Sequence, residues 1–152
     1  MRIEDSFTVP ASIDVVWRAL MDPEIVAPCI PGCREVTALG PTSYRAAVSV
    51  EVGPIKANFN VQVDIRDLRE PRFVATTTRG EEGTRASTLS AESELRLEEF
   101  EGGTRVGYVS EVALVGRLGK FGLGILRKKG EALGRAFADN LRARIAEPSH
   151  PA

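Results

Sequence analysis

The segment Ile55–Arg66 alternates between apolar and polar residues without interruption. Because successive side chains of a strand point to opposite faces, this pattern predicts a strand with one face on a core and the other in water. The preceding segment, Tyr44–Val52, alternates in the same way, and Gly53-Pro54 between them is typical of a tight turn. The two segments therefore predict an antiparallel hairpin whose apolar face needs a partner layer.

Strand patterns continue on both sides of this hairpin. Upstream, we expect a strand that ends at Ser6–Pro10 and an extended segment that begins at Cys33. Downstream, we expect strands over Arg72–Thr78, Ser87–Glu99 and Thr104–Val115. The residues that alternation assigns to the apolar face of these strands include Phe59, Val61, Val63, Leu95, Tyr108 and Val112.

Three segments have helical periodicity and supply the partner layer. A helix is expected from Ser12, a favourable N-cap, and a second short helix from Asp22-Pro23 to Val26. A long C-terminal helix is expected over 118–145, with an apolar stripe at Leu118, Phe121, Ile125, Leu133, Phe137, Leu141 and Ile145. The prediction is an α+β fold of the helix-grip type: a curved antiparallel sheet of about seven strands wrapped on a long C-terminal helix, with two short helices after the first strand.

Length and composition limit the alternatives. A chain of 152 residues with 43% hydrophobic residues and a net charge of −1 is typical of one globular domain, which we expect to span residues 1–146 with a flexible tail over 147–152. No apolar run is long enough for a membrane span, and the first residues lack the apolar core of a signal peptide. We therefore expect a cytoplasmic protein.

The only two cysteines lie in the stretch A-P-C-I-P-G-C, as Cys29 and Cys33. A zinc site needs three or four nitrogen or sulfur ligands, and the chain adds only His150, in its tail. Pro31 and Gly32 instead indicate a corner between a short helix and a strand. We expect no metal site here and interpret both cysteines as small, mostly buried side chains.

A resemblance to a known family covers Phe7 to about Ile145. It is carried by several short motifs in a fixed order: Val16–Leu20 followed by Asp22–Glu24, Cys29–Cys33, Gly53–Ala57, Gly103–Val106 and Val115–Gly122. In these the chain resembles the CoxG family of carbon monoxide dehydrogenase, within the START-like or polyketide cyclase-like (SRPBCC) superfamily.

This resemblance implies a cavity between helix and sheet that binds a hydrophobic molecule, a quinone or a lipid, with no covalent cofactor. It further implies an accessory role for a carbon monoxide dehydrogenase-type molybdenum hydroxylase, in membrane recruitment or in delivery of the electron acceptor. Because the sequence stops soon after the last helix, we expect transient membrane contact, peripheral at the inner face, instead of a permanent anchor. The candidate cavity residues are Phe59, Val61, Val63, Leu95, Tyr108, Val112, Phe121 and Ile125.

The segment from Arg117 to Arg144 holds eight basic residues against two acidic ones, although the whole chain is slightly acidic. A basic helix beside exposed apolar groups such as Phe121, Leu123 or Leu126 suits an anionic lipid surface, an acidic partner protein, or only water. The candidate contact residues are Lys120, Leu123, Arg127, Lys128 and Lys129. Nucleic acid is an unfavourable partner because the chain as a whole is not basic.

Six glycines fall between Gly116 and Gly134, where they weaken a helix. Two interpretations stay open: room for a ligand with a mobile gate over 115–124, or close packing of helix on sheet. For catalysis, the acids of the strands fall on polar faces, and the inward hydroxyls of Ser93, Tyr108 and Ser110 have no base beside them. We assign no catalytic residue and expect a binding and delivery protein; a cyclase- or lyase-type enzyme acting on an apolar substrate is the alternative, and a structural adaptor comes third.

Overall fold

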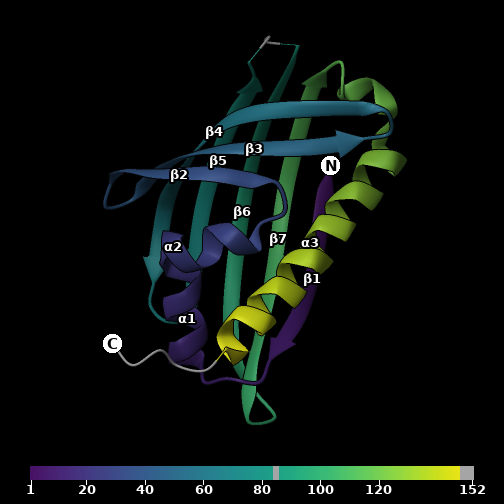
Figure 1. Ribbon diagram of the computed structural model, residues 1–152. Helices are drawn as coiled ribbons and strands as arrows, with labels where there is room; N and C mark the ends of the chain where they lie inside the picture. Colours follow the sequence, from purple (N-terminus) through teal and green to yellow (C-terminus); the bar gives the residue numbers. More distant parts are fainter. Residues whose placement is uncertain (84–85, 148–152) are drawn as a thin grey trace.

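A computed structural model describes residues 1–83 and 86–147. Its seven strands form one antiparallel sheet in the order β1-β7-β6-β5-β4-β3-β2 (Figure 1). Their bounds are β1 Arg2–Val9, β2 Cys33–Gly40, β3 Ser43–Val52, β4 Ile55–Arg69, β5 Phe73–Glu82, β6 Ser87–Phe100 and β7 Gly103–Gly116. Every neighbour in the sheet except β1 beside β7 is also a neighbour in sequence, so the sheet is a meander closed by its first strand.

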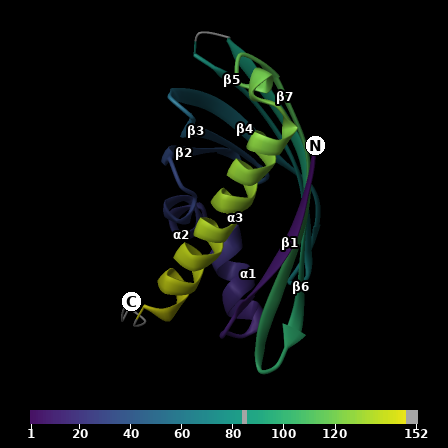
Figure 2. The same cartoon turned by 90° about the vertical axis from the view of Figure 1, so that its right-hand side faces the viewer.

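The helices all lie on the concave side of the sheet, which bends around the longest of them (Figure 2). They are α1 Ile13–Met21, α2 Pro23–Val26, the short 3₁₀ helices η1 Ala27–Cys29 and η2 Gly119–Phe121, and the long C-terminal helix α3 Leu123–Ala146. This arrangement confirms the predicted helix-grip fold, with seven strands and two short helices after the first.

The local signals in the sequence act as expected. Ser12 caps α1 by accepting a hydrogen bond from the Val15 amide at 3.4 Å, and Asp22 caps α2 through the Glu24 amide at 2.9 Å. Gly53 adopts a φ of 58° at the turn between β3 and β4, a left-handed conformation that glycine tolerates best.

The cysteine stretch is the predicted corner between a short helix and a strand. Cys29 ends η1 and is buried, Cys33 begins β2, and both thiols are free. Asn140 of α3 donates a hydrogen bond to the Cys29 carbonyl at 3.0 Å. The corner therefore ties the short helices to the C-terminal half of α3.

The start of the long helix is where the sequence prediction was wrong. Leu118 and Phe121 do not belong to α3, because Gly122 adopts a φ of 87° and separates η2 from the helix. The predicted stripe carried its three- and four-residue steps across this break. As a result, Leu126 is the buried residue of the first turns, at 7% exposed, while Ile125 is 53% exposed.

The core on the concave side consists of two separate apolar clusters. The first, here the α1 cluster, joins α1 and the second half of α3 to one end of the sheet through Val9, Val16, Trp17, Val106 and Leu141, among others. The second, here the hairpin cluster, contains Val52, Ala57, Phe59, Val61, Leu118 and Leu126. The two clusters share no residue, which leaves the middle of the concave face between them.

Candidate functional site

The middle of the concave face is only half-buried. The side chains there come from the centres of β4 to β7, and none of them belongs to either apolar cluster. We call this set the central face: Val63, Thr76, Thr78, Ala91, Ser93, Ser110 and Val112. A part of a concave surface that is lined but not filled by the protein's own apolar side chains is the usual form of a site for a small molecule.

Strand register brings these residues together in two rows. Val63, Thr78, Ala91 and Val112 are direct cross-strand partners across β4, β5, β6 and β7. One position along, Thr76, Ser93 and Ser110 form a second row across β5, β6 and β7. The first row is mainly apolar and the second carries only hydroxyl groups.

The predicted cavity residues divide among three places. Phe59 and Val61 are buried in the hairpin cluster, and Phe121 packs against it from η2. Leu95 and Tyr108 pack against the α1 cluster at its border with the central face. Val63 and Val112 lie on the central face itself.

Ile125 does not join these residues, because it is exposed on α3. Sequence reasoning also missed Thr76 and Thr78 as inward positions. The signal was available, since both share their parity in β5 with the buried Val74. Ser93 and Ser110, which alternation had turned inward, lie on the concave side as expected.

Tyr108 stands where α3 comes closest to β7. A side chain added at Gly134 of α3 would collide with the Tyr108 hydroxyl, and one added at Gly130 would collide with Ile3 of β1. These two glycines therefore serve close packing of helix on sheet. Gly124, by contrast, faces open space, so the glycines of this segment do not share one purpose.

The Tyr108 phenol remains protonated at neutral pH. Burial raises its pKa above the ordinary value of 10.0, the charge of Asp5 raises it further, and Arg135 acts in the opposite direction. A protonated phenol is a hydrogen-bond donor and a poor general base. At the border of the central face, Tyr108 is thus suited to orient a ligand.

A buried ion pair holds the chain between β7 and η2. Glu82 is 3% exposed, and its carboxylate accepts hydrogen bonds from Nε of Arg117 at 3.1 Å and from a terminal guanidinium nitrogen of the same residue at 2.6 Å. The pair lowers the pKa of Glu82. Beside it, the Leu118 amide donates to Ser87 Oγ at 3.1 Å. Sequence reasoning did not identify Glu82, because nothing in its neighbourhood distinguishes it from the other acids of the strands.

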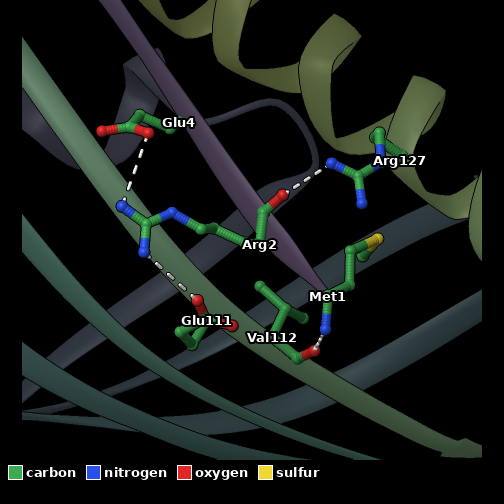
Figure 3. Close-up of polar contacts among 6 residues, drawn as sticks. All are labelled: Met1, Arg2, Glu4, Glu111, Val112 and Arg127. Carbon is green, nitrogen blue, oxygen red and sulfur yellow. Dashed lines mark hydrogen bonds and ion pairs between the residues drawn. The ribbon is translucent and has the colours of Figure 1, made fainter.

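Two arginines of α3 attach the helix to the outer edge of β1. Arg127 donates a hydrogen bond to the Arg2 carbonyl at 2.8 Å, close to where the Met1 amine donates to the Val112 carbonyl at 2.9 Å (Figure 3). Near the other end of the helix, Arg142 donates to the Thr8 carbonyl at 2.7 Å. Part of the basic charge of α3 therefore fastens the helix to the sheet.

The end of the molecule that holds η2 and the first turn of α3 carries exposed apolar side chains (Figure 1). Val115 is 65% exposed, Leu123 64% and Ile125 53%. Lys120 and Lys128, also exposed, form no ion pair within 1–83 and 86–147. We call these five residues the tip.

The residues predicted for a membrane or partner contact divide between the tip and other places. Lys120, Leu123 and Lys128 belong to the tip, and Leu123 is exposed as predicted. Arg127 is engaged with β1, and Lys129 is half-buried on α3. Of the apolar groups expected beside the basic charge, Leu126 is buried and Phe121 half-buried. This is a consequence of the break at Gly122, which changes the face that each residue presents.

A curved antiparallel sheet closed on a long C-terminal helix, with a half-buried strip between two apolar clusters, defines a protein of the START-like class. More narrowly, the chain belongs to the CoxG family, the G-type subunits of carbon monoxide dehydrogenase, whose model matches residues 6–146. The comparison with curated proteins gave no match.

Solved structures share the fold at low sequence identity. A conserved protein from Geobacillus kaustophilus is similar with a TM-score of 0.90 at 22% identity, over 99% of this chain and 98% of that one. A START superfamily protein from Mycobacterium smegmatis gives 0.76 at 14%, over 97% and 99%. The Zhui aromatase/cyclase from Streptomyces sp. R1128 gives 0.66 at 18%, over 95% and 93%.

Family and fold together suggest an accessory protein that binds a hydrophobic ligand. The family name associates such a protein with carbon monoxide dehydrogenase. Among the helices of the described ranges, none combines the length and the apolar character that crossing a membrane requires.

Proposed function

We propose that this protein binds a neutral hydrophobic molecule, a quinone or a lipid, between α3 and the central face. In this role it serves a molybdenum hydroxylase of the carbon monoxide dehydrogenase type, by delivering the electron acceptor or by bringing the enzyme to the membrane. The observation that carries the proposal is the half-buried central face between two closed clusters. Apolar side chains left half-exposed inside a curved sheet gain free energy when a ligand covers them.

The geometry of α3 supports the same proposal. Gly130 and Gly134 bring the helix close to β1 and β7, the strands at one side of the sheet. The helix therefore lies nearer to that side, as Figure 2 shows, and the central positions of β4 and β5 receive less cover from it. A ligand would complete the packing there.

Ligand binding is tested by titrating the purified protein with a prenylated naphthoquinone and following the quenching of Trp17 fluorescence or the heat of binding. We expect saturable binding at one site per chain. Ala91→Trp, which fills the central face, should weaken binding at least about 10-fold. Its control is Ala113→Trp on the opposite face of β7, where the residue is exposed. Equal affinity in both variants, or no saturable binding to the unaltered protein, contradicts the proposal.

The tip supports a transient membrane contact. Exposed leucine and isoleucine side chains beside unpaired lysines are the features with which a peripheral protein meets an anionic lipid surface. Arg127, also predicted for this contact, is already engaged with β1. The expected contact therefore depends most on Leu123, Lys120 and Lys128.

Sedimentation with vesicles tests this contact. We expect binding to vesicles that contain phosphatidylglycerol, less binding to pure phosphatidylcholine, and a decrease as salt increases. Leu123→Asp should abolish it, while Leu39→Asp, at a 44% exposed position on β2, should not. Binding that ignores lipid charge and survives Leu123→Asp excludes the tip as a membrane contact.

An enzyme of the cyclase or lyase type is the second candidate, since a solved neighbour is an aromatase/cyclase. The residues described here favour binding over catalysis. Tyr108 is held in its protonated form, and Glu82 is neutralised by Arg117 at the end of the hairpin cluster. Neither group is available as a general base at the central face.

A further inference from the structure

We propose that the row Thr76, Ser93 and Ser110 is a polar subsite that selects ligands with an uncharged carbonyl group. This inference rests on the proposed function, because it assigns a chemistry to the same site. The three residues are direct cross-strand partners on β5, β6 and β7. They lie between the two apolar clusters, where the ligand would lie.

A hydroxyl row is unexpected at the centre of a concave face. On the same face, β5 carries the buried Val74 and β6 carries Leu95 and the buried Leu97. Packing alone would favour apolar side chains at the neighbouring positions too, because a hydroxyl group taken out of water needs a hydrogen-bond partner. Serine and threonine here indicate that a partner comes from outside the protein.

Hydrogen-bond accounting shows what this subsite offers. Ser93 Oγ and Ser110 Oγ lie 2.8 Å apart, so one hydroxyl donates to the other. Two hydroxyls carry two protons, and their mutual bond uses one of them. Within the described part of the chain, the second proton has no acceptor, and the Thr76 hydroxyl also forms no hydrogen bond. The row therefore presents donors, which suit a carbonyl oxygen.

The charges of the sheet favour an uncharged polar end for the ligand. Strand alternation places three ionised side chains on the concave face, Asp5, Glu82 and Glu99, and all three are acidic. Asp5 lies on the edge strand, Glu82 is paired with Arg117, and Glu99 lies beside Arg72 near the end of β6. The residues of the central face include no cation to neutralise an anion, while neutral donors suffice for a ketone or a quinone.

Three probes of the same size test the inference: a naphthoquinone with a short isoprenoid tail, the naphthalene hydrocarbon with that tail, and a fatty acid. One neutral hydrogen bond corresponds to about 3- to 10-fold in affinity. We expect the quinone to bind tighter than the hydrocarbon by about that factor, and the fatty acid to bind most weakly at pH 7. Tighter binding of the fatty acid overturns the assignment.

The double variant Ser93→Ala/Ser110→Ala should bring the quinone down to the affinity of the hydrocarbon and leave the hydrocarbon unchanged. Ser90→Ala, on the convex face of β6, is the matched control. The infrared stretch of the bound carbonyl should lie at lower frequency in the unaltered protein than in the double variant. Equal binding of quinone and hydrocarbon to the unaltered protein overturns this inference alone, whereas binding of neither overturns the proposed function as well.

Discussion

The two apolar clusters of the concave face are closed in different ways. The α1 cluster is covered by a complete helix and by the second half of α3, and Val16, Val106 and Leu141 within it are 0% exposed. The hairpin cluster is covered by single side chains, Leu118 before η2 and Leu126 in the first turns of α3. One end of the fold is thus built on packed helices, and the other on a short segment that starts and stops at glycines.

This difference has a consequence for opening. Local unfolding occurs most readily where few apolar contacts and few elements must separate. Gly116 and Gly122, both in left-handed conformations, bound the segment that carries Arg117 and Leu118. We expect ligand entry at this end, beside the exposed Leu123 and Ile125, while the α1 cluster keeps the fold intact.

The largest expected effect comes from emptying the stable end. Leu141→Ala removes a fully buried side chain and should lower the free energy of unfolding by about 4 kcal/mol. Leu126→Ala, at 7% exposed and beside a segment able to relax, should cost about 2 kcal/mol. Urea unfolding measures both. Leu39→Ala, at an exposed position, serves as the control and should change the value by less than about 0.5 kcal/mol.

Hydrogen exchange sharpens the same comparison. Leu126→Ala should speed amide exchange in η2 and the first turns of α3 more than in α1, whereas Leu141→Ala should speed exchange throughout. If Leu126→Ala proves as costly as Leu141→Ala and its exchange rises uniformly, the two ends are one cooperative unit and the gate has no physical basis.

A smaller effect separates the glycines of α3. Gly134→Ala adds a methyl group against the Tyr108 hydroxyl and should destabilise the protein by about 1–2 kcal/mol, despite alanine's better helix propensity. Gly124→Ala meets open space and should stabilise it by about 0.5–1 kcal/mol. Thermal or urea unfolding measures both changes.

Tyr108→Phe provides the check on this cause. Without the phenolic oxygen, Gly134→Ala should cost distinctly less, and the double-mutant cycle should show a favourable coupling between the two changes. An unchanged cost would mean that the collision lies elsewhere.

The sheet was predictable because alternation is a local signal with a fixed period. Ile55–Arg66 fell within β4, and Ser12 and Asp22 capped the helices they were expected to cap. The start of α3 was not predictable, because a glycine inside an apolar stripe fits both a continuous helix and a break. Only the left-handed conformation of Gly122 decides between them.

The site was predictable in part, for a related reason. Alternation turns Val63, Ser93 and Val112 inward, but it carries no information about which inward residues the protein's own helices cover. The gap between the two clusters depends on how closely α3 approaches β1 and β7, which Gly130 and Gly134 permit. The partnership of Glu82 with Arg117 joins residues far apart in sequence and left no local trace.

The smallest effect at neutral pH is expected from the ion pair of the hairpin end, because Arg117 is half exposed and its charge stays hydrated. Glu82→Gln should lower stability modestly at pH 7, and its effect should depend on pH. The pKa of Glu82 lies below its ordinary value of 4.5, chiefly because Arg117 donates hydrogen bonds to the carboxylate. Stability from such a group is fully present above pH 4.5 and is lost as the pH falls through the lowered pKa.

The difference in unfolding free energy between the unaltered protein and Glu82→Gln should therefore be constant from pH 7 to about pH 5 and should shrink below that, because only the unaltered protein must protonate Glu82. Urea unfolding at pH 7, 5, 4 and 3 measures it. Arg117→Gln is the control that removes the cause, and in its background the shrinkage should be much reduced. Parallel pH curves for the unaltered protein and Glu82→Gln would mean that the pair does not hold the hairpin end closed, and that Leu118 alone does so.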